Sequence, residues 1–246
     1  MPRALSSNGG VGGKRRGRVY GTLRTQALHY RFKPGQHLPI GVIAGLLKVS
    51  NTPVREALTQ LYAEGLVNAV PARGFFAREL RLQDIVENNM MLEMMVRHCL
   101  EGADLARCQR LGEVADAGMV DAGQKRRSAP RNLACEAECL FQTLGATMGE
   151  STIPVCIRRL CEQTHHIRLR AFESRRIGGK LRQAYAGLTE AVQQQDRSMA
   201  LETFGGFSRL FAKALPHIVS HVLGSAYQSD LKDLANLVMS DDQATC

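Results

Sequence analysis

The chain has 246 residues, of which 44% are apolar, and this content is typical of a globular protein with a substantial core. Its first residues, MPRALSSNGGVGGKRRGR, hold no apolar run of the kind that a secretory signal needs, and no apolar run elsewhere approaches the ~20 residues of a membrane span. We therefore expect a cytoplasmic protein without a membrane partner.

The formal net charge of +9 is unevenly distributed along the chain. Residues 1–80 contain 12 Lys and Arg against 3 Asp and Glu, whereas residues 81–246 contain 20 of each kind. A basic segment joined to a neutral one favours a polyanion as the partner of the first segment. A basic face that is merely solvated is the alternative, and charge alone does not decide between the two.

The first elements are a tail and two helices. Residues 1–17 combine Ser, Asn and Gly with the basic run KRRGR, and this composition predicts a tail without fixed structure. A helix is predicted from Val19 to Tyr30, and the turn signal KPGQ at residues 33–36 ends it. A second, short helix is predicted at Ile40–Leu47, because apolar residues recur in it at helical spacing.

The next helix is predicted from Thr52 to the Glu64–Gly65 pair, because one apolar stripe runs along it. Ser50 or Thr52 is expected to cap its start, and Pro53 suits its first turn, where no hydrogen bond is lost. The stripe has the i, i+3, i+4, i+7 spacing of a buried helix face and consists of Val54, Ala57, Leu58 and Leu61. The opposite, polar face consists of Asn51, Thr52, Arg55, Thr59 and Gln60.

The segments LVNAV, PARG and FFAREL follow this helix and predict a strand, a tight loop and a second strand. Two short helices joined by a tight turn and followed by a hairpin form the winged helix-turn-helix plan. In that plan the second helix enters the major groove of double-stranded DNA, with its N-terminal residues at the base edges. An ordinary helical hairpin is the alternative, but the polar face, the hairpin and the local charge together favour DNA binding.

Beyond Arg81 the pattern is almost entirely helical, without alternating strands or an internal repeat. We therefore predict a mainly α protein, with a winged helix-turn-helix domain at residues 18–80 and an all-helical bundle, for effector binding and dimerisation, at residues 81–246. The predicted helices of the second domain are Asp84–Gln109, Gly112–Lys125, Asn132–Met148, Ile153–Phe172, Gly179–Gln195 and Ser198–Leu223, followed by an amphipathic stretch at Asp230–Met239.

Residues 19–79 resemble the DNA-binding half of the GntR family of bacterial transcription regulators. The family pattern runs PG-x-x-L, VSRTPVREAL-x-x-L-x-x-EGLV and a P-x-RG turn, and this chain has KPGQHL, VSNTPVREALTQLYAEGLV and PARG. The helical remainder resembles the FCD effector domain of the FadR-like subfamily, through LQDI just after the wing and through LTEAVQQQDRSMA. The second of these is similar to that subfamily's Ala-hydrophobic-x-x-x-Asp-x-x-x-Ala segment.

This resemblance also implies which residues bind DNA. They are Ser50, Asn51, Thr52 and Arg55 at the recognition helix, and Arg73 and Gly74 at the wing tip near the minor groove. The family usually has Arg at the position of Asn51. An Arg fork suits guanine O6 and N7, whereas an Asn amide suits adenine N6 and N7, so we expect an altered base preference.

The same resemblance also implies which positions would hold a metal ion. Many FCD domains bind a divalent metal through an Asp, a His four residues later and two further His. The matching positions in this chain are held by Ala137, Phe141, Tyr185 and Phe207. None of these supplies an imidazole or a carboxylate, and a one-residue shift, to Glu138 and Gln142, helps little, so we expect no metal and no other cofactor. In place of a metal centre we expect either an apolar, aromatic-lined effector pocket at these positions or a filled core.

Three further groups of residues each have a functional and a structural interpretation. His217 and His221 have the i, i+4 spacing of a metal pair, but we interpret them as two surface histidines. Cys135 and Cys139 share a helix face, and we interpret them as core thiols rather than a redox switch. Residues 88–95, NNMMLEMM, hold four Met, which we interpret as pliable core packing or a dimer seam rather than a pocket wall.

The sequence contains no G-x-S-x-G, Walker loop, H-E-x-x-H or dinucleotide-binding motif, and we expect no enzyme activity. We predict a homodimeric transcription regulator, specifically a repressor. It would bind a palindromic operator, because a two-fold dimer presents two recognition helices. Its helical domain is expected to dimerise and to hold a small, largely apolar effector. The alternative is a constitutive DNA-binding protein whose helical domain only dimerises.

Overall fold

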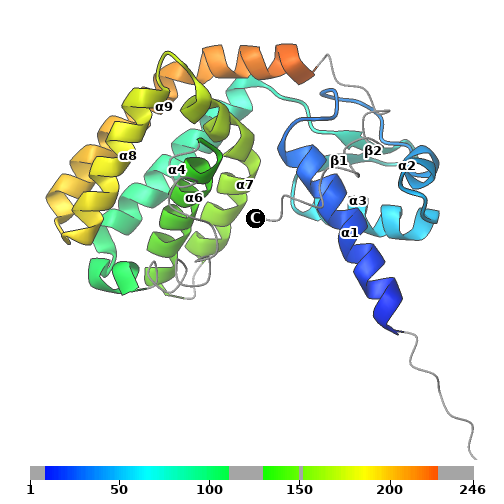
Figure 1. Ribbon diagram of the computed structural model, residues 1–246, viewed down its shortest axis with the longest axis horizontal. Coiled ribbons are helices and arrows are strands. Elements are labelled where there is room, and N and C mark those ends of the chain that lie inside the picture. Colours follow the sequence, from blue (N-terminus) through cyan, green and yellow to red (C-terminus); the bar gives the residue numbers. More distant parts are fainter. Residues whose placement is uncertain (1–8, 111–129, 150–151, 227–246) are drawn as a thin grey trace, which may run out of the picture. The chain divides into compact units, whose positions relative to one another are not determined.

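The computed structural model describes residues 9–110, 130–149 and 152–226 (Figure 1). They fall into two compact units, one containing the residues up to Glu79 and the other Leu80–Val222, and each unit is described by itself. No helix in the described part of the chain is both long enough and apolar enough to cross a bilayer. The mainly α class with an N-terminal winged helix-turn-helix and a helical second part is confirmed.

The first unit contains α1 (Gly9–Leu28), α2 (Ile40–Leu47), α3 (Asn51–Ala63), β1 (Val67–Val70) and β2 (Gly74–Ala77). Helix α1 begins at Gly9 rather than at Val19, so the expected absence of fixed structure is corrected from Gly9 onward. Helix propensity does not account for this extension, because each Gly costs about 1 kcal/mol in a helix interior relative to Ala. Residues 1–8 of the predicted tail lie outside the described residues.

The core of the first unit lies between α1, α2 and α3. Leu23, Ile43, Val54, Leu58 and Leu61 are all completely buried in it. Helices α2 and α3 meet at a tight turn, in which Lys48 has a left-handed backbone with φ 52° and donates its N–H to the carbonyl of Gly45. This turn fixes the angle between the two helices.

The wing is an antiparallel pair in which Val67 faces Ala77 and Val70 faces Gly74. Residues 36–38 extend this sheet, because Leu38 N–H donates to the Phe75 carbonyl at 2.8 Å and Ala77 N–H donates to the Gln36 carbonyl at 2.8 Å. Strand β2 ends at Ala77, earlier than the predicted FFAREL. The wing is therefore held to the loop that precedes α2, and not only by its own hairpin.

The second unit is a helical bundle in which α6 and α7 form an antiparallel hairpin and α4 packs against both (Figure 1). Its labelled helices are α4 (Leu82–Gly102), α6 (Pro130–Thr147), α7 (Thr152–Glu173), α8 (Gly178–Gln193) and α9 (Arg197–Ala226). The last four of these helices match the predicted ones within a few residues. The predicted helix Gly112–Lys125 and the stretch Asp230–Met239 lie outside the described residues.

The predicted helix Asp84–Gln109 is wrong in its last part, because α4 ends at Gly102 and a separate helical segment covers residues 105–110. Arg197, from the start of α9, donates to the carbonyls of Leu100 at 2.6 Å and Ala103 at 2.8 Å and so satisfies the end of α4. Asp104 then accepts the N–H of Arg107 at 3.0 Å and caps the next segment.

Candidate nucleic-acid interface

Helix α3 has one buried and one exposed face. Its apolar stripe, Val54, Ala57, Leu58 and Leu61, is at most 3% exposed and packs into the core of the first unit. Asn51, Thr52 and Arg55 are exposed on the first half of the helix. Within the described residues, the structure gives no hydrogen bond or ion pair to the side chains of these three. Their donors and acceptors are therefore available to a ligand.

Ser50 occupies the N-cap position of α3 but makes no side-chain cap hydrogen bond, so the predicted capping role is not observed. An N-cap hydroxyl usually accepts the N–H of the second or third helical residue, and one of these two donors is missing here because the third residue is Pro53. The Ser50 side chain is exposed.

The second half of the exposed face is tied to the protein itself. Thr59 Oγ1 donates to the carbonyl of Arg55 at 2.8 Å, and Gln60 Nε2 donates to Glu64 Oε1 at 3.2 Å. The hydroxyl of Tyr20, on α1, also donates to Glu64 Oε1, at 2.6 Å. Exposed side chains without a hydrogen bond or ion pair among the described residues thus lie in the first half of α3, while Glu64, just after the helix, joins it to α1.

The anchor at Glu64 joins α3 to α1. Arg24, also on α1, lies 3.6 Å from Glu64 Oε2. Burial, and after it the hydrogen bond to the Glu64 carboxylate, raise the pKa of Tyr20 to about 12. Tyr20 therefore stays protonated and keeps donating at neutral pH. The sequence does not point to this anchor, because its residues lie far apart along the chain.

The wing tip presents Arg73 over an aromatic ring. The Arg73 guanidinium carbon lies 5.4 Å from the centre of the Phe76 ring, and the centre of the His37 ring lies 5.0 Å from that same centre. Gly74 has φ 93°, a backbone conformation that favours glycine, while a Cβ there would only come into contact with His37 Nε2, at 3.4 Å. Arg73 is exposed, as predicted for a residue that reaches DNA.

The predicted effector positions lie in the core of the helical unit. Ala137 and Phe141 are buried on α6, Tyr185 on α8 and Phe207 on α9. The rings of Phe141 and Phe207 are 6.3 Å apart, and Phe172 links them to Tyr185, lying 6.2 Å from Phe207 and 6.3 Å from Tyr185. The three aromatic positions therefore belong to one cluster of side chains in mutual contact.

These four side chains do not fit a divalent metal, because an alanine and three aromatic rings offer no imidazole or carboxylate ligand. In the part of the chain that the structure describes, no group of three or more His, Cys, Asp or Glu side chains is arranged to hold a metal ion. His217 and His221 are both exposed on α9, as interpreted. Cys139 is exposed and Cys135 half-buried, so the interpretation of both as core thiols is wrong for Cys139.

A buried ion pair lies beside this aromatic cluster. Glu138 on α6 accepts from the guanidinium of Arg168 on α7, whose other terminal nitrogen donates to Thr164 Oγ1 at 2.8 Å. His165 Nδ1 lies 3.1 Å from both Glu138 oxygens. Arg168 is 2% exposed, and its guanidinium carbon lies 6.0 Å from the Phe141 ring centre. Sequence reasoning identifies Glu138 only as an alternative metal position and misses its partners.

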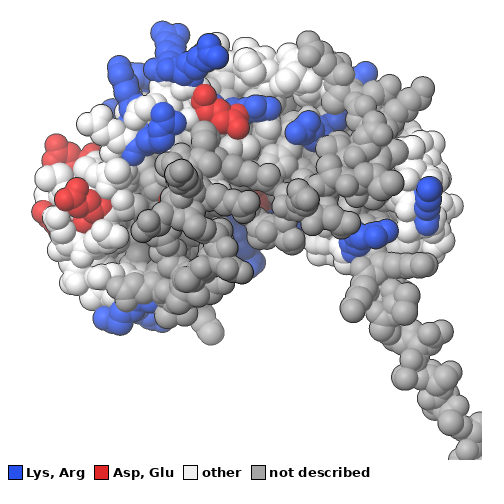
Figure 2. Space-filling model, in the orientation of Figure 1, with Lys and Arg blue, Asp and Glu red and all other residues white. Residues whose placement is uncertain are grey.

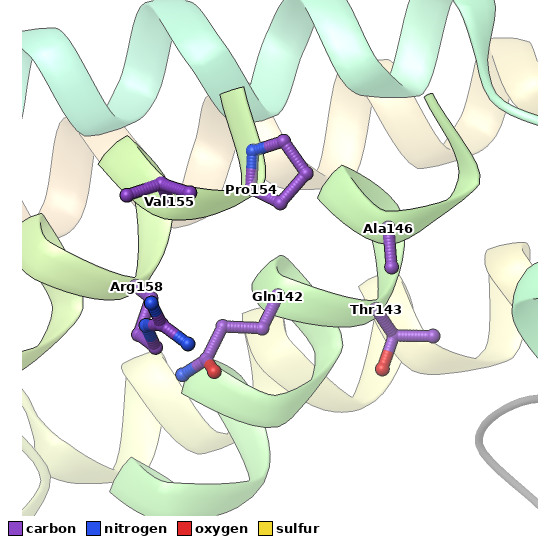
Figure 3. A pocket seen from close by; sticks show the side chains of 6 residues that line it. All are labelled: Gln142, Thr143, Ala146, Pro154, Val155 and Arg158. Carbon is purple, nitrogen blue, oxygen red and sulfur yellow. The ribbon is translucent and has the colours of Figure 1, made fainter. Parts of the chain in front are cut away.

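A hollow opens on the surface of the helical unit, with a cavity volume of ≈ 370 Å³. Figure 3 shows the six side chains that line it, from α6 and α7: Gln142, Thr143, Ala146, Pro154, Val155 and Arg158. None of the predicted effector residues is among them.

Comparisons with known proteins agree with this geometry. Residues 15–77 match the sequence profile described as "Bacterial regulatory proteins, gntR family". The "Nta operon transcriptional regulator" of Aminobacter aminovorans is 30% identical over 166 residues, which cover 61% of this chain and 72% of that protein.

Two solved structures are similar in fold. A protein described as a transcriptional regulator GntR from Rhodococcus sp. RHA1 has a TM-score of 0.54 at 21% identity, covering 86% of this chain and 99% of that one. Lar of Listeria monocytogenes, described as controlling expression of the agr system, has a TM-score of 0.53 at 15% identity, covering 93% of this chain and 100% of that one.

Proposed function

The chain belongs to the GntR family of bacterial regulatory proteins and is a transcription regulator with a DNA-binding winged helix-turn-helix, and on that premise we propose that it acts as a homodimeric repressor at a palindromic operator. The observation that carries the proposal is the first half of α3. There Asn51, Thr52 and Arg55 are exposed on a helix whose other face is fully buried. Proteins of this family are regulators rather than enzymes.

The proposed DNA contacts divide by chemistry. Asn51 and Arg55 carry the donors that read base edges in the major groove, Asn favouring adenine and Arg favouring guanine. Ser50 and Thr52 lie at the start of the same helix, where hydroxyl groups suit backbone phosphates. Arg73, with Gly74 giving it a close approach, would enter the minor groove from the wing. Repression then needs only occupancy of the operator.

Replacing Arg55 by Ala tests this proposal. The variant should bind the operator more weakly by roughly 1–3 kcal/mol, because it has no guanidinium to donate to a base edge. Its melting temperature should be unchanged, because the Arg55 side chain is exposed and makes no hydrogen bond or ion pair with the described residues. Fluorescence anisotropy on operator fragments, selected with the wild-type protein from genomic DNA of the source, measures the affinity.

Arg31→Ala is the matched control, since Arg31 is an exposed cation of the same unit that lies outside α3 and the wing. It should change operator affinity little. Equal decreases in the two variants would mean that Arg55 acts only through net charge, and unchanged affinity in Arg55→Ala would remove α3 from the interface.

The dimer is proposed to use the exposed methionines of α4. Met90, Met91 and Met94 are 57%, 44% and 62% exposed, so the interpretation of these residues as core packing is wrong for them, and we take the dimer seam rather than a pocket wall as the proposal. Apolar side chains at this spacing form one stripe on a helix, and two copies packed about a two-fold axis would cover it.

Met94→Glu should therefore shift the protein from dimer to monomer in sedimentation equilibrium, because two like charges would face each other at the two-fold axis. The same change at Met199, an exposed methionine of α9, is the control and should leave the dimer intact. A Met94→Glu protein that stays dimeric at micromolar concentration would place the interface elsewhere.

The aromatic contacts favour a second candidate function, in which the protein binds DNA constitutively and the helical unit only dimerises. Ala137, Phe141, Tyr185 and Phe207 are at most 6% exposed, and the three rings belong to one packed cluster. A small apolar effector at these positions would have to displace them. Replacing one of these rings by a small side chain is an experiment that distinguishes a filled core from an effector pocket.

A further inference from the structure

The turn between α7 and α8 carries a group of cations without partners. Arg175, Arg176 and Lys180 are exposed, and the structure gives none of them a hydrogen bond or ion pair within the described residues. Figure 2 shows Lys and Arg side chains gathered at the end of the helical unit where Figure 1 draws this turn. We name these three residues the α7–α8 cationic surface. It stands out because residues 81–246 as a whole hold equal numbers of acidic and basic residues, 20 of each.

The neighbouring residues do not neutralise this surface. Glu173, the acid that precedes it in the chain, pairs with Arg170 at 2.8 Å. Helix α8 has no acidic residue in its first turn, and its N-cap residue, Ile177, makes no side-chain cap hydrogen bond. Arg182 adds another cation on the same helix and donates to the Phe172 carbonyl at 3.1 Å. Among the described residues, the positive charge of Arg175, Arg176 and Lys180 is therefore left without a counter-charge.

The turn holds these cations on a fixed backbone. Gly178 N–H donates to the Ser174 carbonyl at 2.8 Å, and Leu181 N–H donates to the Ile177 carbonyl at 2.9 Å. Gly178 is buried, and a Cβ at this position would collide with the Phe172 carbonyl, so α7 and α8 meet too closely for any other residue. The backbone that carries the cations therefore does not need to be ordered on binding, and only their exposed side chains lose conformational freedom.

The two helix ends that meet at this turn act differently on its cations. The first turn of a helix carries a positive partial charge, which anions stabilise and cations destabilise. Lys180 lies in the first turn of α8 and is repelled there, whereas Arg175 and Arg176 directly follow the end of α7 at Glu173, where the negative partial charge of the helix end attracts cations. Repulsion at the start of α8 therefore concerns Lys180 above all, and a bound polyanion would relieve it.

The surface lies at a defined end of the helical unit. Near the start of α4, Asn88 Nδ2 donates to Gln163 Oε1 of α7 at 3.3 Å. At the end of α4, a Cβ on Gly102 would lie 3.2 Å from the side chain of Met148, which precedes α7. Helices α4 and α7 are therefore antiparallel. The end of α7, and the turn that follows it, share the end of the unit where α4 begins and where the chain enters after the winged helix.

We propose that the α7–α8 cationic surface binds the phosphate backbone of duplex DNA beside the operator. Two guanidinium groups and an ammonium are suited to phosphate oxygens, and the surface offers no aromatic ring on which an unpaired base would stack. The inference rests on DNA binding by the winged helix and adds a second, sequence-independent contact made by the helical unit.

The test uses the full chain and a 40-base-pair duplex of mixed sequence, because phosphate contacts do not depend on sequence. Arg175, Arg176 and Lys180 are replaced together by Ala, and affinity is measured by anisotropy over a series of salt concentrations. The slope of log affinity against log salt should become shallower by about 0.9 for each phosphate that is no longer neutralised, or about 2 to 3 in total. The melting temperature should change little, because the three side chains are exposed, and the repulsion lost at the start of α8 is offset by the attraction lost at the end of α7.

A matched triple variant carries Ala at Arg107, Arg158 and Arg159, which are exposed cations toward the other end of the unit. A shallower slope in the first triple variant alone supports the proposal. Equally shallow slopes in the two triple variants would overturn it, because net charge would then explain the result. A wild-type slope in the first triple variant would also overturn it, because the surface would then contact no phosphate.

The single variant Arg176→Glu shows whether a folding defect of the triple variant causes the result. It should make the slope of log affinity against log salt shallower and keep the wild-type melting temperature. Arg55→Ala is measured in parallel on selected operator fragments. If Arg55→Ala weakens operator binding while the α7–α8 variants keep the wild-type slope, the winged helix binds DNA and the further contact is wrong. If wild-type protein selects no operator at all, the proposed function itself fails.

Discussion

Arg168→Met is expected to lower the free energy of unfolding by about 3–5 kcal/mol, because it removes one partner of a buried ion pair. Arg168 has the largest fully buried side chain among the described residues, and its guanidinium contacts Glu138 and Thr164. Without it, the Glu138 carboxylate is left in the interior with His165 as its other partner. Methionine fills a similar volume, so the decrease would reflect charge rather than a cavity.

Urea denaturation followed by circular dichroism measures the effect. The double variant Arg168→Met/Glu138→Leu should recover most of the stability, because an apolar pair of similar volume replaces the ion pair. Arg170→Met is the control, since the Arg170–Glu173 pair is about one third exposed and should contribute less than about 1 kcal/mol. A double variant as unstable as Arg168→Met would show that packing, and not the unpaired carboxylate, causes the destabilisation.

Phe207→Ala is also expected to lower the free energy of unfolding by about 3–5 kcal/mol, because the ring is buried against three others. The Phe207 ring lies 6.3 Å from Phe141, 6.2 Å from Phe172 and 6.3 Å from Phe211. Removing it should leave an apolar cavity, and small aromatic molecules enter such cavities. Indole should therefore raise the melting temperature of Phe207→Ala and leave that of the wild type unchanged.

Met199→Ala on the same helix is the control and should change stability by less than about 0.5 kcal/mol, because Met199 is exposed. The opposite result would favour an effector pocket. If wild-type protein is stabilised by indole, and Phe207→Ala costs less than about 1 kcal/mol, the rings of the native protein already leave room for a ligand at these positions.

The sequence is sufficient where local pattern decides the structure. Helix α2 has the predicted bounds, Ile40–Leu47, and α3 starts one residue before the predicted Thr52, because an apolar stripe and a proline mark these segments locally. The end of α4 could not be predicted in this way. It depends on the guanidinium of Arg197, which donates to the Ala103 carbonyl from 94 positions further along the chain.

In the candidate site, too, features set by local pattern could be predicted and contacts between distant residues could not. The exposed face of α3 follows from periodicity, and the wing tip from the turn residues. The contacts that hold these parts, from Tyr20 to Glu64 and from His37 to Phe76, join residues that are distant in the chain, and no local pattern marks such pairs. The Glu138–Arg168 pair escapes prediction for the same reason, since its two residues come from different helices.

The two halves of α3 differ in what a substitution there would disturb. The side chains of Asn51, Thr52 and Arg55 make no hydrogen bond or ion pair with the described residues, whereas Glu64, to which Gln60 donates, joins the end of the helix to α1. Selection or design can therefore exchange the residues of the first half without lowering the stability of the protein. A gene duplicate could acquire a new operator through a few substitutions there, with the scaffold unchanged. In proteins built this way, the set of regulated genes would therefore change more readily than the fold.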